Sequence, residues 1–237
     1  MLEQLGVGKV SDYYHLVYGY IRLKGKGKMS SRKGNVVSAD WLLDEMVSRA
    51  EKINKKVGEE VGIGAIKYGL LKLSREKDVE FDIDESLSLE GNSGPYIQYT
   101  YARIRSLLEK GKKPKKDGPR RVKRGGVKQK MVIRAKEPVK KASIPEPEFN
   151  KEEEAVLRAI IHFPEVVRLA AERHSPNLVC GYLYDLASSF NALYNKHRIL
   201  DLKTGKHSAF RLMIAGATGQ ILENGLGLLG ISAPEEM

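Results

Sequence analysis

Residues 178–200 read LVCGYLYDLASSFNALYNKHRIL and show the clearest helical pattern in the chain. Apolar side chains recur in this stretch at spacings of three and four positions, which places them on one face of a helix. These side chains are Leu178, Tyr182, Leu186, Phe190 and Leu193. Because a helix with one apolar face must bury that face against other elements, the stretch predicts a core helix of a helical bundle.

Segments on both sides of this helix predict its neighbours. A helix that contains Leu157 and Ile160 is expected to end at Pro164, and a second helix is expected to end before Pro176. A further helix is predicted over about residues 209–229. Four helices joined by short turns are typical of a compact bundle, which would occupy the C-terminal portion of the chain.

The N-terminal portion has a mixed pattern. Residues 15–23 are aromatic and β-branched, and residues 79–83 alternate with period two, so both predict strands. Helices are predicted after Ser38, which is a good N-cap residue, and over residues 59–73. Another helix is expected to begin with Pro95 at its first position, where the missing N–H costs nothing.

The net charge of +11 comes from one segment. Residues 110–141 hold 15 Lys and Arg against 2 Asp and Glu, so this segment carries +13 and the rest of the chain −2. Proline and glycine interrupt the segment, and it has little apolar sequence, so we expect it to be disordered when free. Its charge leaves two interpretations open: a solvated linker, or an electrostatic arm that contacts nucleic acid.

Composition excludes several classes of protein. The single cysteine, Cys180, excludes a disulfide framework within the chain, and no apolar stretch is long enough to span a membrane. The N-terminus lacks the pattern of a secretory signal, so a cytoplasmic protein with no membrane partner is expected. The five histidines show no metal-ligand spacing. Asp78, Asp82 and Asp84 are interpreted as solvated or helix-capping residues, so no metal site is predicted.

One loop has the composition needed for phosphate chemistry. Residues 24–34 read KGKGKMSSRKG and combine cations with glycines. Glycine allows such a loop to change shape, and Lys26, Lys28 and the pair Arg32-Lys33 can surround a polyanion such as a pyrophosphate leaving group. A plain basic loop is the alternative interpretation of the same residues.

Four blocks of the sequence resemble one family. The block KMSSRKGNVV (residues 28–37) resembles the second signature of class I aminoacyl-tRNA synthetases, in the form found in arginyl-tRNA synthetases. Three further blocks agree with that family in order and spacing. They are FDID with EGNSGPYIQYTYAR (81–84 and 90–103), YLYDLASSFNALY (182–194), and LENGLGLLGI closing in PEEM (222–231 and 234–237).

This resemblance implies a mainly α fold in two parts. Residues 1–75 would be the end of a Rossmann-type catalytic domain, with the signature loop and connecting helices. Residues 76–237 would form a helical anticodon-binding domain, interrupted at 110–148 by the basic insert. The His-Ile-Gly-His signature that such enzymes carry upstream is absent from the sequence. We therefore expect the C-terminal part of a longer enzyme, inactive alone, whose upstream half is missing or forms a separate chain.

For the complete enzyme, the resemblance implies ATP-dependent activation of arginine and its transfer to arginine tRNA. ATP would be a substrate, accompanied by Mg²⁺, and the partners would be ATP, arginine and the tRNA. Lys28, Arg32 and Lys33 are the implied catalytic residues. The implied phosphate loop consists of Lys28, Met29, Ser30, Ser31, Arg32 and Lys33. Ser31 replaces the second lysine of the common signature, so Arg32 or Lys33 is expected to contact the phosphates instead.

A tRNA surface is also implied, on the side of the helix over 178–200 that is opposite its apolar face. Its candidate residues are Tyr184, Asn191, Tyr194, Asn195 and Arg198. Such a face can stack on splayed anticodon bases and hydrogen-bond their edges, although an ordinary surface is the alternative. Further candidates are Gln98, Tyr99, Arg103 and the C-terminal Met237. The first three either approach the tRNA or brace the bundle against the catalytic domain.

Two functions without catalysis remain open beside this one. The chain would be a stand-alone module that binds tRNA or another RNA, or a helical scaffold whose basic arm docks on RNA.

Overall fold

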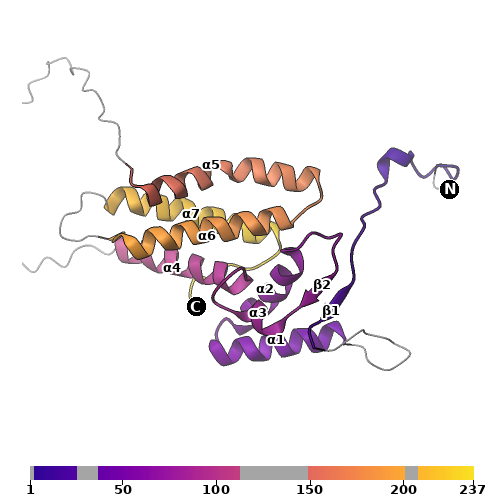
Figure 1. Cartoon of the computed structure of the whole chain (residues 1–237), viewed down its shortest axis with the longest axis horizontal. Helices are drawn as coiled ribbons and strands as arrows, with labels where there is room; N and C mark the ends of the chain where they lie inside the picture. Colours follow the sequence, from indigo (N-terminus) through magenta and orange to yellow (C-terminus); the bar gives the residue numbers. More distant parts are fainter. Residues whose placement is uncertain (1–2, 26–36, 113–148, 201–207) are drawn as a thin grey trace, which may run out of the picture.

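The computed structural model describes residues 3–25, 37–112, 149–200 and 208–237. Its elements form two parts that lie side by side (Figure 1). The 3-10 helix η1 (Val10–Asp12) precedes both parts and projects away from them (Figure 1), with no buried residue. The first part, here called the small part, contains two strands and three helices: β1 (Ile21–Leu23), α1 (Ala39–Ile53), α2 (Gly58–Leu71), β2 (Val79–Phe81) and α3 (Ile83–Leu87). The second part, the bundle, contains α4 (Gly94–Lys112), α5 (Lys151–Glu172), α6 (Asn177–Lys196) and α7 (Ser208–Leu228).

The small part is built on two helices and a minimal sheet. Helix α1 begins as predicted after Ser38, whose hydroxyl accepts a hydrogen bond from the backbone N–H of Trp41 at 3.1 Å. The two strands pair in parallel, with Ile21 opposite Val79 and Leu23 opposite Phe81. A buried cluster joins β1, β2 and α3 to the inner faces of α1 and α2. Elements that are far apart in the sequence therefore share one small core.

The predicted strand over residues 15–23 is wrong in its length. Only Ile21–Leu23 is a strand, and residues 13–20 form neither helix nor strand. Strand β2 offers only three residues for pairing, so most of the aromatic and β-branched stretch has no sheet partner there. Tyr18 is consequently 82% exposed. The pattern was correct in predicting a strand but carries no information on the length of its partner.

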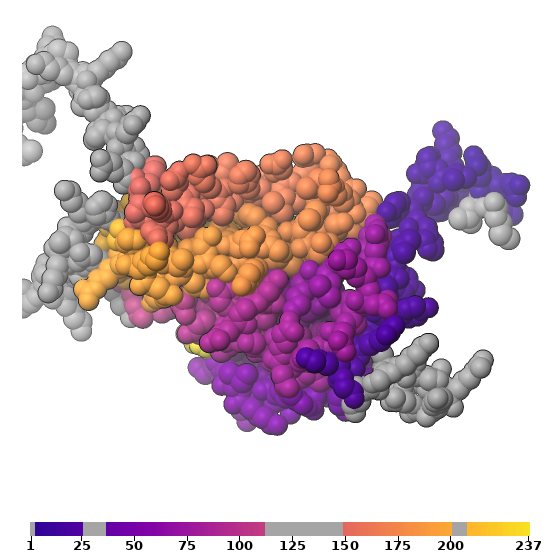
Figure 2. Space-filling model, viewed as in Figure 1, coloured from indigo at the N-terminus to yellow at the C-terminus, as the bar shows by residue number. Residues whose placement is uncertain are grey.

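The bundle core confirms the predicted apolar face of α6. Leu186, Phe190 and Leu193 are fully buried, and Leu178 and Tyr182 are partly buried against the same cluster. Helix α4 contributes Ile97 and Ile104 to this core. Figure 2 shows α4, in magenta, lying between the orange bundle helices and the small part. The fourth member of the bundle is therefore α4.

The prediction that a helix ends at Pro164 is wrong. Residues 151–172 form the single helix α5, with Pro164 inside it. Proline in a helix interior costs about 3 kcal/mol. Val156 and Ala170, on either side of the proline, are both buried in the bundle core, so packing along the whole helix outweighs that cost. The C-terminal portion consequently contributes three helices to the bundle and not four.

The two cores meet at α2. This helix places Val61 and Ala65 in the core of the small part and Tyr68 in the core of the bundle. Strand β2 and α3 belong to the small core, although they follow residue 75. The domain boundary expected between residues 75 and 76 stays a prediction. The packing places the seam between the two parts along α2 and α4.

Candidate functional site

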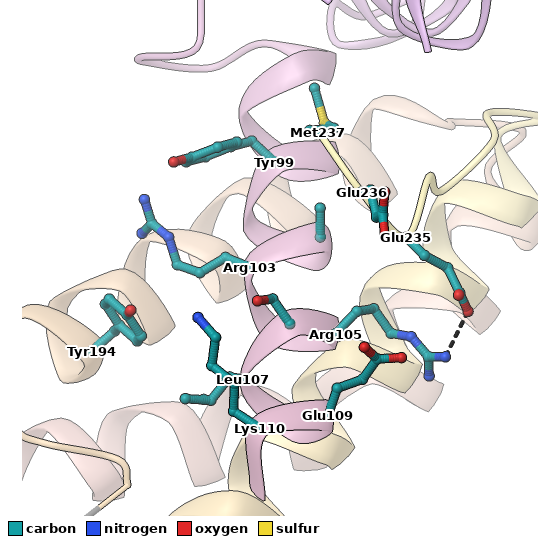
Figure 3. A pocket seen from close by; sticks show the side chains of 12 residues that line it. Tyr99, Arg103, Arg105, Leu107, Glu109, Lys110, Tyr194, Glu235, Glu236 and Met237 are labelled. Carbon is teal, nitrogen blue, oxygen red and sulfur yellow. Dashed lines mark hydrogen bonds and ion pairs between the residues drawn. The ribbon is translucent and has the colours of Figure 1, made fainter. Parts of the chain in front are cut away.

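A pocket of about 510 Å³ lies where α4, the C-terminal half of α6 and the C-terminal segment meet (Figure 3). Twelve residues line it: Tyr99, Ala102, Arg103, Arg105, Ser106, Leu107, Glu109, Lys110, Tyr194, Glu235, Glu236 and Met237. The structure thus brings together Tyr99, Arg103, Tyr194 and Met237, four of the predicted tRNA contacts.

Arg103 lies between two aromatic rings at this pocket. The carbon at the centre of its guanidinium is 4.8 Å from the ring centroid of Tyr99 and 5.1 Å from that of Tyr194. Both distances are within the range of cation–π contacts. Tyr99 and Tyr194 are 36% and 37% exposed, so both residues are partly open to solvent beside the guanidinium.

Asn191 fixes Arg103 and ties α6 to α4. Its Oδ1 accepts a hydrogen bond from Arg103 Nη1 at 2.6 Å. Its Nδ2 donates to the hydroxyls of Tyr96 at 3.0 Å and Thr100 at 2.9 Å. Both N–H groups of the amide are therefore engaged. Asn191 shapes the surface by holding Arg103 in place, and its own amide edge is not open to a ligand.

The other predicted contacts on α6 divide between the surface and the helix interface. Asn195 and Arg198 are exposed near the C-terminal end of α6. The carbonyl of Arg198 accepts a hydrogen bond from Arg211 Nη1 at 2.9 Å, which links this end to α7. Tyr184 is half-buried, with its ring centroid 5.7 Å from that of Tyr96. Tyr184 thus lies within the α4–α6 interface and apart from the pocket.

Gln98 is fully buried and points away from the pocket. Its Nε2 donates to the carbonyl of Ser232 at 2.8 Å and to that of Glu60 at 3.4 Å. The side chain therefore links α4 to both α2 and the C-terminal segment. Of the two roles considered for Gln98, this placement corresponds to bracing the bundle and not to contacting a ligand.

The C-terminal segment is held at the seam between the two parts. Lys67 donates to the carbonyl of Gly230, and Ile231 is buried in the bundle core. Arg105 Nη2 pairs with Glu235 Oε1 at 2.5 Å, the dashed contact in Figure 3. Met237 packs against the core of the small part. The last residues therefore form one wall of the pocket as fixed structure.

Charges in the pocket are balanced. Arg103, Arg105 and Lys110 face three carboxylates, those of Glu109, Glu235 and Glu236. A pocket with this balance offers no excess of positive charge for a phosphate, whereas its aromatic rings and guanidinium suit a planar base.

Sequence reasoning missed eight of the twelve lining residues, among them Ser106 and Lys110. These two follow Tyr99 by seven and eleven positions. This is the spacing of one helix face, so the signal was present in the sequence.

The predicted phosphate-loop residues, Lys28 through Lys33, lie outside the described residues, as does most of the insert at 110–148. The start of the loop is described. Lys24 donates its N–H to the carbonyl of Phe81 at 2.9 Å and pairs through Nζ with Asp82 Oδ2 at 2.8 Å. The hydrogen bond with Asp82 raises the pKa of Lys24, and the same contact lowers the pKa of Asp82. This ion pair fixes the residue from which the loop departs.

Of the acidic residues interpreted as solvated or helix-capping, Asp82 caps a helix, whereas Asp78 and Asp84 form ion pairs with Arg22 and Arg49. Asp82 Oδ1 accepts from the backbone N–H groups of Asp84 and Glu85 and so caps α3. Asp78 accepts from the N–H of Tyr20 and pairs with Arg22 at 3.0 Å. Within the described ranges, no group of three His, Cys, Asp or Glu side chains could hold a metal ion. No described helix is long and apolar enough to cross a membrane.

Comparison with known proteins agrees with the geometry. Residues 97–237 match the model of the DALR anticodon binding domain, a span that contains every residue lining the pocket. The chain belongs to the DALR anticodon-binding domain family. The mainly helical fold expected from the sequence motifs is confirmed with it.

Members of this family with similar sequences are arginine–tRNA ligases. The enzyme of Flavobacterium psychrophilum is 33% identical over 251 aligned positions, which cover 100% of this chain and 37% of the relative. The enzyme of Bacteroides thetaiotaomicron is 35% identical, with 38% of its length covered. The chain thus spans little more than a third of these relatives. The resemblance to arginyl-tRNA synthetases is confirmed.

Solved structures show the same arrangement. Arginyl-tRNA synthetase of Thermus thermophilus superposes with a TM-score of 0.71 and 30% identity, covering 94% of this chain and 35% of that chain. The Plasmodium falciparum enzyme superposes with a TM-score of 0.65 at 23% identity, which supports the fold alone.

Proposed function

We propose that this chain acts as the C-terminal part of an arginine–tRNA ligase and binds the anticodon loop of arginine tRNA at the α4–α6 pocket. The observation that supports this site most directly is Arg103 between the partly exposed residues Tyr99 and Tyr194. Two comparisons support the same proposal. Residues 97–237 match the DALR anticodon binding domain, and the whole chain is similar to arginine–tRNA ligases.

At this pocket, splayed bases would stack on the exposed part of an aromatic ring. Single-stranded loops are recognised in this way because every base has a π-face, and each stacked base contributes about 1–3 kcal/mol. Hydrogen bonds to the base edges would come from the Arg103 guanidinium, which keeps N–H groups beyond the one given to Asn191. Asn195, near the end of α6, and Arg198, just after that helix, are exposed and would meet the neighbouring nucleotides.

The loop that contains Lys28, Arg32 and Lys33 would serve the chemical step in the complete enzyme. There, ATP accompanied by Mg²⁺ would activate arginine, and the arginyl group would pass to the tRNA. Cations of a mobile loop stabilise charge that develops on a pyrophosphate leaving group. Since the chain covers 37% of its relatives, the upstream region of such enzymes would supply the remainder of the active site.

The anticodon proposal is tested by filter binding of the chain to arginine tRNA and to the same tRNA with an exchanged anticodon. Tyr194→Ala should weaken binding of the cognate tRNA by about 1–3 kcal/mol, the value for one stacked base. The exchanged tRNA should lose less, because its anticodon lacks the edge hydrogen bonds to Arg103 that would hold a base against the ring. Tyr18→Ala, which removes an exposed tyrosine of the small part, is the matched control. Equal losses for both tRNAs would show that Tyr194 packs the bundle and does not read the anticodon.

The alternative is a tRNA- or RNA-binding module without catalysis. The basic segment over residues 110–141 favours it, because charge of this density binds RNA whatever its sequence. ATP–pyrophosphate exchange separates the two functions when the chain is completed with an upstream half from a related ligase. Arginine-dependent exchange would support the ligase, whereas retained tRNA binding without exchange would support the module.

A further inference from the structure

Arg75 lies where three segments of the chain meet. Its guanidinium donates through Nη1 to the carbonyl of Val17 at 3.0 Å, through Nη2 to the hydroxyl of Tyr14 at 3.1 Å, and through Nε to the carbonyl of His174 at 3.2 Å. Its own carbonyl accepts from the N–H of Gly19 at 2.7 Å. The side chain is only 18% exposed. One residue therefore bonds the segment before β1 to the corner between α5 and α6.

His174 forms the bundle side of this contact and has an unusual backbone. Its φ is +50°, the left-handed region in which glycine is usual. The helix end is otherwise regular: Ser175 donates to the carbonyl of Ala170, and His174 donates to that of Ala171. The imidazole stacks on the ring of Tyr14, with centroids 4.6 Å apart and planes 12° from parallel. The strained position is thus occupied by a side chain that makes a contact glycine cannot make.

The segment bonded by Arg75 leads directly into β1. Gly19 passes so close to the carbonyl of Lys77 that a side chain there would clash. The N–H of Tyr20 donates to Asp78 at 2.9 Å, and its carbonyl accepts from Val79. These contacts bind β1 to the small part alone. Arg75 adds a direct bond to the bundle, and Figure 2 shows the indigo N-terminal segment reaching the orange corner of α5 and α6.

We propose that Arg75 and His174 form a joint that fixes strand β1 on the α5–α6 corner of the bundle. Arg75 is then a positioning residue for Lys24, the residue at the end of β1 from which the basic loop departs. The arginine fork suits this role because it makes three divergent hydrogen bonds that a lysine ammonium cannot reproduce. The joint would then also position the loop for catalysis, and this consequence rests on the proposed function.

Hydrogen exchange of the chain tests the joint without reference to activity. In Arg75→Ala, the amides of Gly19, Tyr20 and Lys24 should exchange at least about tenfold faster, because the segment opens locally. Amides in the core of the bundle should exchange at the wild-type rate. Arg173→Ala is the matched control, since it removes an exposed arginine one residue from His174, and it should change none of these amides.

His174→Gly gives a second, independent test, because it should act in opposite directions on the two sides of the joint. Glycine adopts the left-handed backbone without strain, so the C-terminal turn of α5 should exchange more slowly. Loss of the stacking ring should speed exchange at Gly19 and Tyr20. Unchanged exchange at these two amides in both Arg75→Ala and His174→Gly would overturn the joint. Faster exchange throughout the bundle in Arg75→Ala would also overturn it, since Arg75 would then be a residue of general stability.

The catalytic consequence is measured in the complete enzyme. Arg75→Ala should lower kcat of ATP–pyrophosphate exchange by about tenfold to 10²-fold, the range expected for a small misplacement of a reacting group. The KM for ATP and the Kd for arginine tRNA should change less than twofold. An unchanged kcat would overturn the positioning role. Failure of the wild-type chain to bind arginine tRNA would instead contradict the proposed function. The hydrogen-exchange results on the joint would still hold in that case.

Discussion

The bundle and the small part use similar helices but close their cores in different ways. In the bundle, four helices cover one another, and Leu183, Leu186 and Phe190 of α6 are completely buried between them. The small part has a parallel sheet of three residue pairs. Parallel sheets are normally covered on both faces, yet here Ile21 of β1 is exposed. The bundle therefore has a large core that also takes in Tyr68 of α2, whereas the small core is closed by short elements and lies against α4 mainly through α2.

An apolar pocket of about 360 Å³ on the small part makes the same point. It is lined by Ile21, Leu23, Val37, Ser38, Ala39, Leu42, Leu43, Ile66, Leu70 and Phe81. A sheet of this size adds little stability by itself. We consequently expect the small part to unfold before the bundle when its own core is weakened.

The largest expected effects come from truncating each core in turn. Phe190→Ala should lower the free energy of unfolding by about 3–5 kcal/mol and Met46→Ala by about 2–5 kcal/mol, because both side chains are fully buried. Far-UV circular dichroism in urea reports mainly on the bundle. Fluorescence of Trp41, the single tryptophan, reports on the small part.

These two signals should respond differently to the two substitutions. In Phe190→Ala both transitions should move together, since the small part loses the surface on which it packs. In Met46→Ala the Trp41 transition should move to lower urea and separate from the circular dichroism transition. Coincident transitions in Met46→Ala would show that the two parts unfold as one unit, and the comparison would fail.

The same contrast explains how much could be predicted from the sequence. The apolar face of α6 was evident because the bundle obeys helical periodicity, and Ser38 was evident as a cap because capping is local. The length of β1 depends on how many residues β2 offers, which no pattern in residues 15–23 records. Pro164 lies within α5 because the helix packs along its whole length. Long-range packing decided each of these differences.

The candidate site shows the same limit. Its aromatic and cationic residues could be named from helix faces and from resemblance, but not their partners. Asn191 was a candidate for reading bases, yet its amide is engaged by Arg103, Tyr96 and Thr100, which lie on another helix about ninety positions earlier. Gln98 was a candidate for contacting tRNA, yet it bonds the carbonyl of Ser232. Such pairs follow from the tertiary fold and carry no periodic signal.

A smaller effect is expected from disturbing the seam itself. A Cβ at Gly94 would lie 2.9 Å from the carbonyl oxygen of Gly64 and 3.0 Å from Cβ of Tyr68, so α4 and α2 could not approach as they do. Gly94→Ala should cost about 1–3 kcal/mol, as overpacking does. It should separate the Trp41 transition from the circular dichroism transition. Gly181→Ala is the control, because that position of α6 has open space for a methyl group. The higher helix propensity of alanine should raise the free energy of unfolding slightly in this variant. Coincident transitions in Gly94→Ala would show that the seam does not couple the parts.

The smallest expected effect concerns the bundle alone and depends on pH. Glu152 on α5 pairs with Lys196 Nζ at 2.6 Å and lies 3.2 Å from His197 Nε2, both at the end of α6. The hydrogen bond from Lys196, followed by that from His197, lowers the pKa of Glu152 to about 2.

A carboxylate whose pKa is lower in the folded state than in the unfolded state stabilises the fold at pH values above its unfolded pKa of about 4.3. That contribution is lost as the pH falls from about 4.3 towards 2. The Tm of the wild type should therefore exceed that of Glu152→Gln by a small amount from pH 7 to pH 5, and the difference should shrink as the pH falls from 5 towards 2. Glu109→Gln, an exposed change on α4, should show no such pH-dependent difference. A Tm difference for Glu152→Gln that is as large at pH 2 as at pH 5 would mean that the side chain acts through its shape and not through its charge.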